Sequence, residues 1–518
     1  MRDTTTTFRW WPAALILAGA VIALMVQWWG EGTDTQMRVL NTYQVLAATL
    51  ALLLVWLLFL SALRWRLRLG LFAAVVALGG LFAATFRIVG VDGNLLPVLA
   101  FRWSGEGSFE SGSGAADVAT SPFDFPQFLG PDRSGQIDSV RLAGDWQASP
   151  PVELWRREVG AAWSGFSVVG DAAVTLEQRD GQEVVVRYAL ESGEVVWTQA
   201  VDAVFDTTIG GSGPRSTPTI HAGRVYTVGA TGIIRAVDLV SGALIWRRDL
   251  GEDHGSQAPS WGFSGSPLVV DLDHQAEDGP AESLVVVPAG GKGSNLVAYR
   301  ASDGEPAWAA GDDRIGYSSP SRHVLAGVPQ IVIFNGGSIA GHAPDDGRQL
   351  WTYPWSSEQP NVAQPLPLGE DRLLVSSGYG IGSSLLQLIV DDAGTWSVEQ
   401  LWKSPRMKAK FTNLVEHEGF IYGLDDGVLV CLDPATGKRR WKRGRYGHGQ
   451  ILLVSDALLV QTEAGEVVML DPNPDEHREL GKIQALDGKS WNNPTVAGSI
   501  LLVRDADEAA AYRLTLAE

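Results

Sequence analysis

The segment Asp433-Pro434-Ala435-Thr436-Gly437-Lys438-Arg439-Arg440-Trp441 ends on a tryptophan that stands four residues after a glycine. The same pattern, a Ser, Asp or Thr followed by Gly and then by Trp four residues later, occurs five times in the chain. The five pairs are Gly193 and Trp197, Gly242 and Trp246, Gly304 and Trp308, Gly347 and Trp351, and Gly437 and Trp441. Self-similarity at a period of a few tens of residues is typical of solenoids and propellers. The repeat therefore decides the fold class.

Each copy of the repeat predicts antiparallel strands joined by tight turns. A Ser, Asp or Thr followed by Gly supplies the positive-φ residue that a hairpin needs. The tryptophan four residues later then lies on the next strand, where its ring can be buried between neighbouring sheets. Apolar or alternating runs precede the turns, as in Arg224-Val225-Tyr226-Thr227-Val228 and Gly419-Phe420-Ile421-Tyr422, and such runs predict strands.

The number of copies predicts the number of blades. Outermost strands are expected at Trp155, Trp197, Trp246, Trp308, Trp351, Trp402, Trp441 and Leu480, at intervals of 39 to 62 residues. These intervals suit a four-stranded blade. The last copy, Trp491 to Leu514, lacks an outer strand, whereas Val152–Trp155 is an outer strand without a blade. Joining the two would hide both sheet edges, so we expect an all-β, eight-bladed β-propeller over residues 122–518. The copies before Trp402 and Leu480 lack the glycine and are the least regular.

The Asp433–Trp441 motif and the stretch from Asp238 through Gly242 to Trp246 resemble the blade motif of the pyrroloquinoline-quinone (PQQ)-like repeat family. The segment Phe125-Pro126-Gln127-Phe128-Leu129-Gly130-Pro131-Asp132-Arg133-Ser134-Gly135 is similar to an opening segment common in bacterial membrane-anchored members. The resemblance covers roughly residues 122–518 and implies an eight-bladed propeller. It does not imply an activity, because one fold hosts many functions.

Two branches of this family imply different functions. The quinoprotein alcohol dehydrogenases bind PQQ with calcium against a disulfide between adjacent cysteines, but this chain has the single cysteine Cys431. No Glu, Asn and Asp set maps onto their calcium and base positions. The BamB-like branch consists of interaction proteins held by a lipidated N-terminal cysteine, for which transmembrane helices would substitute here. We therefore expect a protein-interaction or small-ligand-binding platform at the cell envelope without a cofactor. A PQQ-dependent quinoprotein oxidoreductase with calcium is the alternative.

Three uncharged apolar stretches, at about residues 10–30, 39–63 and 69–86, predict a membrane anchor within residues 1–100. About 20 helical residues cross the hydrocarbon core. Arg2 and Arg9 precede the first stretch, and Arg64, Arg66 and Arg68 lie between the second and third. The positive-inside rule then places the N-terminus in the cytoplasm and residues 122–518 outside it. A cleaved signal peptide is the alternative for the first stretch, and it too would leave the C-terminal part outside. Residues 101–121 are Gly/Ser-rich and acidic, which favours a flexible linker.

Charge and cysteine content exclude several classes of function. Residues 1–100 hold seven arginines and four acidic residues, so the remaining chain has 33 basic and 55 acidic residues. Such an acidic domain repels phosphate backbones, which excludes nucleic acid as a partner. A single cysteine excludes an internal disulfide, a CxxCH haem site and a thiolate zinc site. Cys431 lies in the apolar run Val428–Leu432 and is expected to be an inert core thiol.

The sequence offers no catalytic residues and no metal site. It contains no HExxH, no GxSxG in a strand–turn–helix context and no P-loop. Asp271, Asp273 and Glu277 are spaced as in a calcium loop, but Ala276 stands where such loops have glycine. A solvated acidic loop is the favoured interpretation of this segment.

The starts of the blades carry the only ligand-binding candidates. The innermost strand of a propeller blade begins near the central channel, where equivalent positions of different blades converge. The candidates from these positions are Arg215, Trp261, Tyr317, Lys410, Asn413, His448 and Trp491. Cations, an amide and aromatic faces together could bind an anionic or planar polar ligand. In the alternative interpretation, the polar side chains pair exposed strand ends and the aromatic rings fill the channel.

The orientation of the anchor gives a first testable prediction. An alkaline phosphatase that is active only outside the cytoplasm, fused after Glu518, is expected to be active. The reason is the concentration of arginines in the loops assigned to the cytoplasm. A reporter that folds only in the cytoplasm should be inactive at the same position, and its activity there would contradict the topology.

Overall fold

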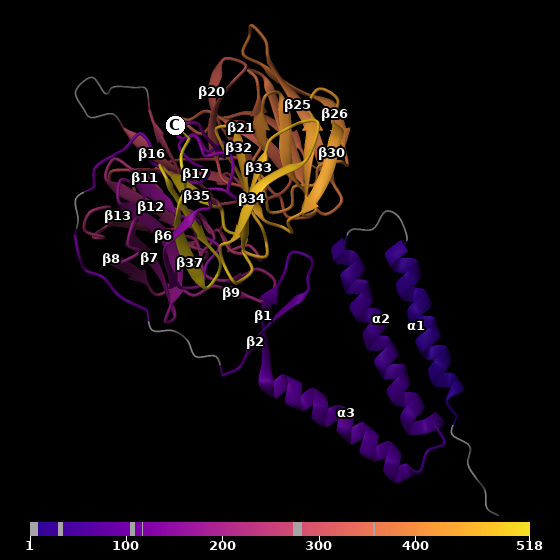
Figure 1. The fold of residues 1–518 in the computed structure, drawn as a ribbon. Helices are drawn as coiled ribbons and strands as arrows, with labels where there is room; N and C mark the ends of the chain where they lie inside the picture. Colours follow the sequence, from indigo (N-terminus) through magenta and orange to yellow (C-terminus); the bar gives the residue numbers. More distant parts are fainter. Residues whose placement is uncertain are drawn as a thin grey trace, which may run out of the picture. The chain divides into compact units, whose positions relative to one another are not determined.

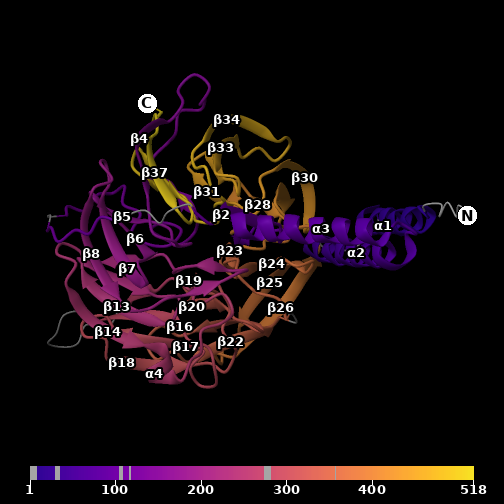
Figure 2. The same ribbon diagram turned by 90° about the horizontal axis from the view of Figure 1, so that it is seen from below.

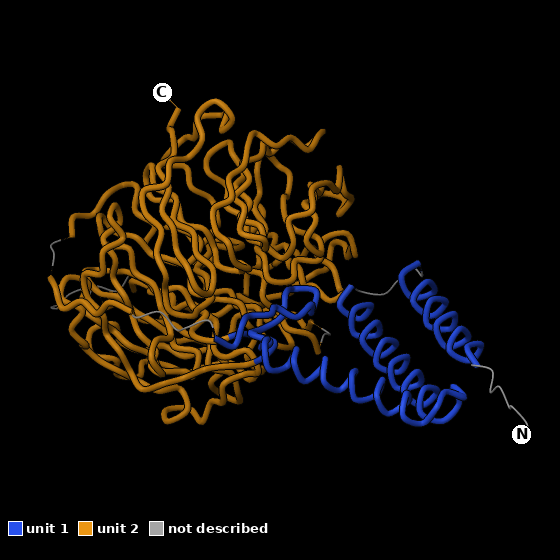
Figure 3. The backbone as a smooth tube through the Cα atoms, turned by 60° about the horizontal axis from the view of Figure 1, so that its bottom comes forward, with its two compact units in different colours: residues 1–106, 208–211 blue, residues 107–207, 212–518 orange. Residues whose placement is uncertain are grey.

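The computed structural model describes residues 9–29, 35–103, 109–115, 118–272, 282–355 and 358–517. The chain forms two compact units, residues 1–106 with 208–211 and residues 107–207 with 212–518 (Figure 3). Some sequence expectations concern Arg2 and residues 30–34, 104–108 and 273–281, which lie outside the described residues.

The first unit contains three long apolar helices. They are α1 (Trp11–Trp29), α2 (Thr35–Val55), which continues into the π-helical turn η1 (Trp56–Leu60), and α3 (Trp65–Thr85). Each is long and apolar enough to cross a membrane, which confirms three membrane-compatible segments. Two of them begin four residues before the expected starts, at Thr35 and Trp65, because the helices continue through flanking arginines that the uncharged runs exclude. A hairpin of β1 (Phe86–Val91) and β2 (Pro97–Phe101), which was not expected, follows α3.

The second unit is built from eight four-stranded antiparallel sheets that follow one another around a central axis (Figures 1 and 2). Blade 1 consists of β5 (Ser167–Val169), β6 (Ala172–Arg179), β7 (Gln182–Ala189) and β8 (Val195–Val201). Blade 2 consists of β11 (Thr219–His221), β12 (Arg224–Val228), β13 (Ile233–Asp238) and β14 (Leu244–Asp249). Blade 3 consists of β15 (Leu268–Asp271), β16 (Ser283–Pro288), β17 (Leu296–Arg300) and β18 (Pro306–Ala310). Blade 4 consists of β19 (Ser321–Leu325), β20 (Val328–Phe334), β21 (Ser338–His342) and β22 (Gln349–Pro354).

The remaining blades have the same strand order. Blade 5 consists of β23 (Leu366–Leu368), β24 (Arg372–Ser377), β25 (Gly382–Val390) and β26 (Trp396–Ser404). Blade 6 consists of β27 (Val415–His417), β28 (Phe420–Asp425), β29 (Val428–Asp433) and β30 (Lys438–Arg445). Blade 7 consists of β31 (Gln450–Val454), β32 (Ala457–Gln461), β33 (Glu466–Asp471) and β34 (Arg478–Gln484), with the short strand β3 (Gln136–Ile137) beside β31. Blade 8 consists of β35 (Thr495–Ala497), β36 (Ile500–Arg504), β37 (Glu508–Arg513) and β4 (Val152–Glu158). The expected eight-bladed β-propeller is confirmed.

Two short ribbon strands and one helical turn lie in the connections that flank blade 2. The strands are β9 (Asp206–Thr207) and β10 (Gly211–Ser212), and the helix is α4 (Leu250–His254). The Asp249 side chain caps α4 by accepting hydrogen bonds from two backbone N–H groups of its first turn, as expected for an N-cap aspartate.

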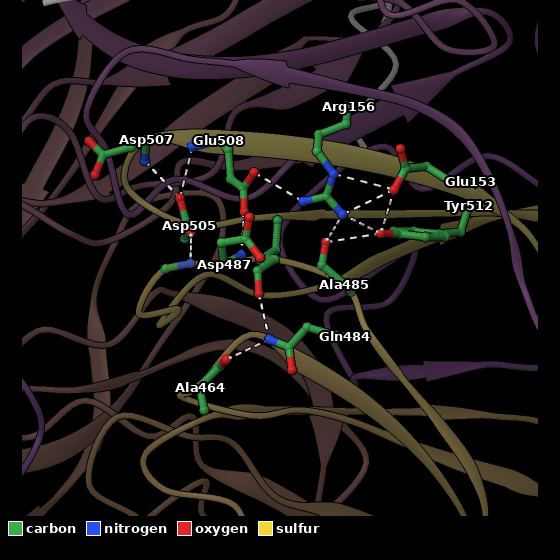
Figure 4. A network of polar contacts seen from close by, with 12 residues as sticks. Glu153, Arg156, Ala464, Gln484, Ala485, Asp487, Asp505, Asp507, Glu508 and Tyr512 are labelled. Atoms are coloured by element: carbon green, nitrogen blue, oxygen red, sulfur yellow. Dashed lines mark hydrogen bonds and ion pairs between the residues drawn. The ribbon is translucent and has the colours of Figure 1, made fainter. Parts of the chain in front are cut away.

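The ring closes through β4, which pairs with β37 so that Trp155 lies opposite Ala511. A polar network holds the two strands together (Figure 4). Arg156 of β4 forms ion pairs with Glu508 of β37 and with Glu153, each at 3.0 Å. The buried Arg504 of blade 8 reaches into blade 1, where it donates to Thr175 Oγ1 at 2.9 Å and to the Gly160 carbonyl oxygen at 2.9 Å. The expected closure of the ring by the strand that contains Val152–Trp155 is confirmed.

The repeated tryptophans join each blade to the next one. The Trp197 ring of blade 1 covers Gly242 in the last turn of blade 2, and its Nε1 donates to the Leu239 carbonyl oxygen at 3.0 Å. A Cβ at Gly242 would lie 2.6 Å from that ring, and the glycine has a φ of +72°. The glycine therefore serves two purposes, the left-handed turn and the close approach of the ring. The same contact joins Trp155 to Gly193, Trp246 to Gly304, Trp308 to Gly347 and Trp402 to Gly437.

The two blades without the motif glycine depart from this pattern. Trp351 faces blade 5, which has a longer last turn, and its Nε1 bonds to Gln330 in its own blade. Trp441 faces blade 7, where its Nε1 donates to the Asn473 carbonyl oxygen at 3.0 Å and His477 packs edge-on against its ring. Trp441 thus keeps the indole hydrogen bond to the last turn of the next blade, with His477 in place of the glycine, whereas Trp351 bonds within its own blade.

Part of the expected linker packs on blade 1. The Gly114 N–H donates to the Val196 carbonyl oxygen at 2.8 Å, and the Thr198 N–H donates to the Gly112 carbonyl oxygen at 3.1 Å. A Cβ at Gly112 would lie 2.5 Å from the Val196 carbonyl oxygen. The glycines of this segment thus let the backbone approach the open edge of β8. The described residues of the segment cover a sheet edge, as edge protection requires.

Truncation of a repeat tryptophan tests the contact between blades. Trp246→Ala is expected to lower the free energy of unfolding by about 3–5 kcal/mol, because the ring is buried and leaves a cavity. Leu244→Ala on the same strand is the control, since Leu244 is 49% exposed, and should change stability by less than about 0.5 kcal/mol. Denaturant unfolding monitored by fluorescence measures both. A loss below about 1 kcal/mol for Trp246→Ala would contradict the role given to the contact.

Removal of residues 122–158 tests the closure. This deletion removes β4 and leaves the edge of β37 unpaired, so the protein is expected to aggregate. Size-exclusion chromatography and thermal unfolding report the result. A monodisperse, cooperatively unfolding product would show that β4 is not needed to close the ring.

Candidate interaction surface at the channel mouth

One end of the channel, here called the mouth, is the end at which every innermost strand begins. Because each blade is a four-stranded antiparallel sheet, its outermost strand ends at the mouth as well. Arg215, Tyr317, His448 and Trp491 hold equivalent places four residues before their innermost strands, or two in the case of blade 7. Trp163 and Phe411 hold the corresponding places in blades 1 and 6.

Aromatic rings from six blades form a continuous layer across the mouth. The Trp491 ring centroid lies 4.9 Å from that of Trp163 and 5.2 Å from that of Phe411. Phe411 in turn lies 5.9 Å from Trp261 and 5.6 Å from His448. Trp261 and Tyr317 are 5.1 Å apart. Three of the predicted residues, Trp261, His448 and Trp491, thus surround Phe411, which the sequence analysis did not select, and a fourth, Tyr317, joins the layer through Trp261.

Three cations border the aromatic layer. The Lys489 Nζ lies 3.8 Å from the Trp491 centroid and 4.7 Å from the Trp163 centroid. The buried Lys410 places its Nζ 4.9 Å from the Tyr379 centroid. The Arg215 guanidinium lies 4.4 Å from the Phe205 centroid, and burial lowers the Arg215 pKa to about 10. Cation–π contacts therefore hold all three cations against ring faces.

Glu463 is the carboxylate of this layer. Its Oε1 accepts a hydrogen bond from Trp491 Nε1 at 2.8 Å, and its Oε2 accepts from the His448 N–H at 3.0 Å. The carboxylate therefore fixes the orientation of Trp491 and the backbone of His448. The role of His448 in contacting a ligand stays a prediction.

Directly beneath the aromatic layer lies a belt of polar side chains that link neighbouring blades. Each side-chain oxygen accepts a hydrogen bond from the backbone N–H of the equivalent residue in the preceding blade. Thr217 accepts from Gly165 at 3.1 Å, Ser266 from Thr217 at 2.9 Å, Ser319 from Ser266 at 2.9 Å, Gln364 from Ser319 at 3.0 Å and Asn413 from Gln364 at 3.0 Å. The Gln450 amide then bridges the carbonyl oxygens of Phe411 and Trp491, and Asn492 reaches the Ser164 carbonyl oxygen of blade 1.

Asn413 belongs to this belt and not to the aromatic layer. Its Oδ1 is occupied by the Gln364 N–H, and the side chain is 6% exposed. The seven predicted residues therefore do not hold one equivalent place. Trp261 and Lys410 precede that place in the chain, and Asn413 follows it. Ligand binding by the seven residues stays a prediction.

The opposite end of the channel is filled by the opening segment of the propeller, residues 125–137. The Phe125 backbone pairs with Val168 of blade 1, and the Ile220 N–H of blade 2 donates to the Pro126 carbonyl oxygen at 2.8 Å. The buried Arg133 points into the channel and donates to the carbonyl oxygens of Ser266 at 3.1 Å and Pro320 at 2.8 Å.

Arg133 has a neutral partner for every N–H group. Besides the two carbonyl contacts, it donates to Thr219 Oγ1 at 3.2 Å, to the Pro267 carbonyl oxygen, and through Nε to Gln127 Oε1 at 2.8 Å. Burial without a carboxylate lowers the Arg133 pKa to about 9. An arginine has five N–H donors, so the contacts leave no donor for an anion. Through these hydrogen bonds, Arg133 links blades 2, 3 and 4.

The residues that the sequence analysis missed are Trp163, Phe411, Lys489 and Glu463. Trp163 and Phe411 stood in the blade starts from which the candidates were chosen, so strict alignment of equivalent positions would have found them. Lys489 and Glu463 carry no such signal. They reach the mouth from a hairpin tip and a connection between blades, whose position only the fold determines.

A PQQ site of the dehydrogenase kind implies ligands for calcium and a disulfide between adjacent cysteines. Among the described residues, no group of three His, Cys, Asp or Glu side chains could hold a metal ion. Of the expected acidic loop that begins at Asp271, Asp273 and Glu277 lie outside the described residues. Glu463, the mouth carboxylate, already accepts two hydrogen bonds. Cys431 is buried in β29, where desolvation raises the pKa of its thiol to about 11. These donors do not fit the calcium and disulfide arrangement that PQQ binding in dehydrogenases implies.

Solved structures with the same architecture include enzymes. A europium-containing methanol dehydrogenase superposes with a TM-score of 0.58 at 13% identity, covering 76% of this chain and 98% of the other. The quinohemoprotein alcohol dehydrogenase from Comamonas testosteroni superposes with a TM-score of 0.53 at 14% identity, covering 77% of this chain and 81% of the other. At such low identity, these likenesses concern the fold alone.

Comparison by sequence leads to proteins that are named as outer membrane protein assembly factors. The outer membrane protein assembly factor BamB of Shewanella oneidensis is 22% identical over 368 residues, which are 68% of this chain and 87% of that protein. The family model described as outer membrane protein assembly factor BamB matches residues 151–271 and 279–443, more than half of the chain. The matched residues begin in β4 and run through blade 6. The chain therefore belongs to the BamB family of PQQ-like β-propellers.

Proposed function

We propose that this protein is a membrane-anchored, extracytoplasmic platform that binds envelope proteins at the mouth of its channel. The observation that carries the proposal is the layered filling of the channel. The aromatic layer, the polar belt and Arg133 follow one another along the axis, so the described residues at the mouth offer a broad aromatic surface. A small polar ligand is the second occupant that the same surface would suit.

The composition of the mouth supports protein binding. Trp, Tyr and Arg are the residues that most often dominate binding energy at protein interfaces. Trp163, Trp261, Tyr317 and Trp491 are each partly exposed, and Arg215 lies beside them. Their orientations are already fixed by stacking and by Glu463, so binding would cost little side-chain entropy. Family membership supports the same conclusion, because the matched relatives are named as assembly factors.

The alternative of a PQQ-dependent oxidoreductase finds no comparable support. The dehydrogenase likenesses concern the fold, and the donors at the mouth do not match the calcium and disulfide arrangement described above. The visible spectrum of the purified full chain, recorded with and without added PQQ and calcium, separates the two functions. We expect no bound quinone absorbance, and a stoichiometric quinone spectrum would favour the oxidoreductase.

Site-specific photocrosslinking tests the platform directly. A benzoyl-phenylalanine in place of Trp491 or Trp163, in the full chain in its own membrane, is expected to give discrete protein adducts. The control is the same replacement at Val324, which is 61% exposed near the opposite end of β19. Lys489→Glu should weaken the adduct formed at position 163, because it reverses the charge beside that position. Equal adducts at Val324, or none at the mouth, would rule out the mouth as the docking surface.

A further inference from the structure

The outermost strand of blade 6, β30, differs in charge from every other outer strand. Its eight residues, Lys438-Arg439-Arg440-Trp441-Lys442-Arg443-Gly444-Arg445, include six basic and no acidic side chains. The other seven outer strands have at most two basic residues each. This basic strand lies in a domain that is strongly acidic as a whole. Its charge is therefore a local feature and not a consequence of composition.

Half of the charges on β30 are compensated within the fold. Lys442 pairs with the buried Asp425 at 2.6 Å, Arg439 approaches the same carboxylate at 3.7 Å, and Arg440 pairs with Asp475. Lys438, Arg443 and Arg445 are exposed, and the described residues place no carboxylate within ion-pair distance of them. Arg443 and Arg445 stand at the end of β30, which is the mouth end of the blade.

The chain enters the propeller at the same end. The Arg179 guanidinium lies 5.1 Å from the centroid of the Phe109 ring and donates to the Glu110 carbonyl oxygen at 2.8 Å. Arg179 ends β6, which runs toward the mouth. Only 23 residues, 86–108, lie between Thr85 at the end of α3 and Phe109. The segment that connects α3 to the mouth end of the propeller is therefore short.

We propose that Arg443 and Arg445 bind anionic phospholipid headgroups, so that the mouth end of blade 6 docks on the membrane that anchors the chain. This inference rests on the proposed anchoring. Basic residues beside a membrane anchor are attracted to anionic lipid, whereas the acidic remainder of the domain is repelled by it. The basic end of β30 would thus orient the propeller on the lipid surface.

The shape of β30 favours a lipid surface over a strand from another protein. Two β-bulges interrupt its pairing with β29, near Val428 and near Cys431. Bulges and rows of like charge on an edge strand oppose the addition of a further strand. Headgroup phosphates need no regular backbone ladder, and arginine binds phosphate oxygens in bidentate geometry.

Energy transfer in lipid nanodiscs tests the proposal with the full chain. A donor dye is attached to Ala464→Cys, an exposed position in the β32–β33 hairpin at the mouth. The buried Cys431 should not react. An acceptor is attached to lipid headgroups. We expect higher transfer in discs with phosphatidylglycerol than in discs of phosphatidylcholine alone. The difference should vanish at about 1 M salt, where the screening length is about 3 Å.

Neutral substitutions identify the residues responsible. Arg443→Gln with Arg445→Gln should lower the ratio of docked to free propeller roughly 30-fold, from about fivefold for each basic residue near the surface. Arg247→Gln with Arg348→Gln is the matched control. It removes the same charge from exposed sites on other blades and should leave the transfer unchanged.

The outcomes separate this inference from the anchoring on which it rests. Failure of the chain to co-elute with discs would contradict the anchoring itself. Co-elution with equal transfer in both lipids, or no effect of the Arg443 and Arg445 substitutions, would overturn the lipid docking. Binding of soluble poly-glutamate that depends on these arginines, without any lipid effect, would assign the strand to an acidic protein segment instead.

Discussion

The contact between a tryptophan of one blade and the turn glycine of the next is the interaction on which the propeller depends. It recurs at five of the eight blade junctions, with the ring flat against a residue that has no side chain. A Cβ at any of these glycines would lie within 3 Å of ring atoms. Glycine is therefore required for two reasons: it has no side chain, and it readily adopts the positive φ of the turn. Each blade stabilises its neighbour in this way. A ring without its last strand would still expose an unpaired sheet edge. The strand β4 prevents this by completing blade 8 from the start of the domain.

Ring closure brings the starts of the innermost strands together, with polar residues at one height on the axis and the aromatic residues of six blades at another. The polar residues pair with neighbouring backbones and form the belt, and the aromatic residues above them make a layer that the belt supports. On the other side, Arg133 donates five hydrogen bonds to neutral acceptors, three of which are backbone carbonyl oxygens. Burying an unpaired charge is costly unless its hydrogen bonds are complete, and here they are. The proposed recognition therefore uses the outer face of the aromatic layer.

Charge is distributed unevenly over that surface. The domain is acidic overall, yet three cations border the mouth and two uncompensated arginines stand at the mouth end of β30. The chain also enters the propeller at this end, through Phe109 and Glu110. A concentration of positive charge, aromatic rings and the point of attachment on one end suits a surface that works close to a membrane. Both proposals made above use this end of the propeller.

The sequence by itself determined the repeat, the number of blades, the closing strand and the apolar helices, because glycine turns, tryptophans and apolar runs are local signals. It also identified the blade starts as the positions that converge. Only the tertiary structure decided which of those residues meet. Asn413 and Phe411 are two residues apart, yet one lies in the belt and the other at the centre of the aromatic layer, since successive residues of an extended chain occupy different heights along the axis. Glu463, Lys489 and the packing of Gly112 and Gly114 on β8 had no local signal, because contacts between blades depend on the closed ring.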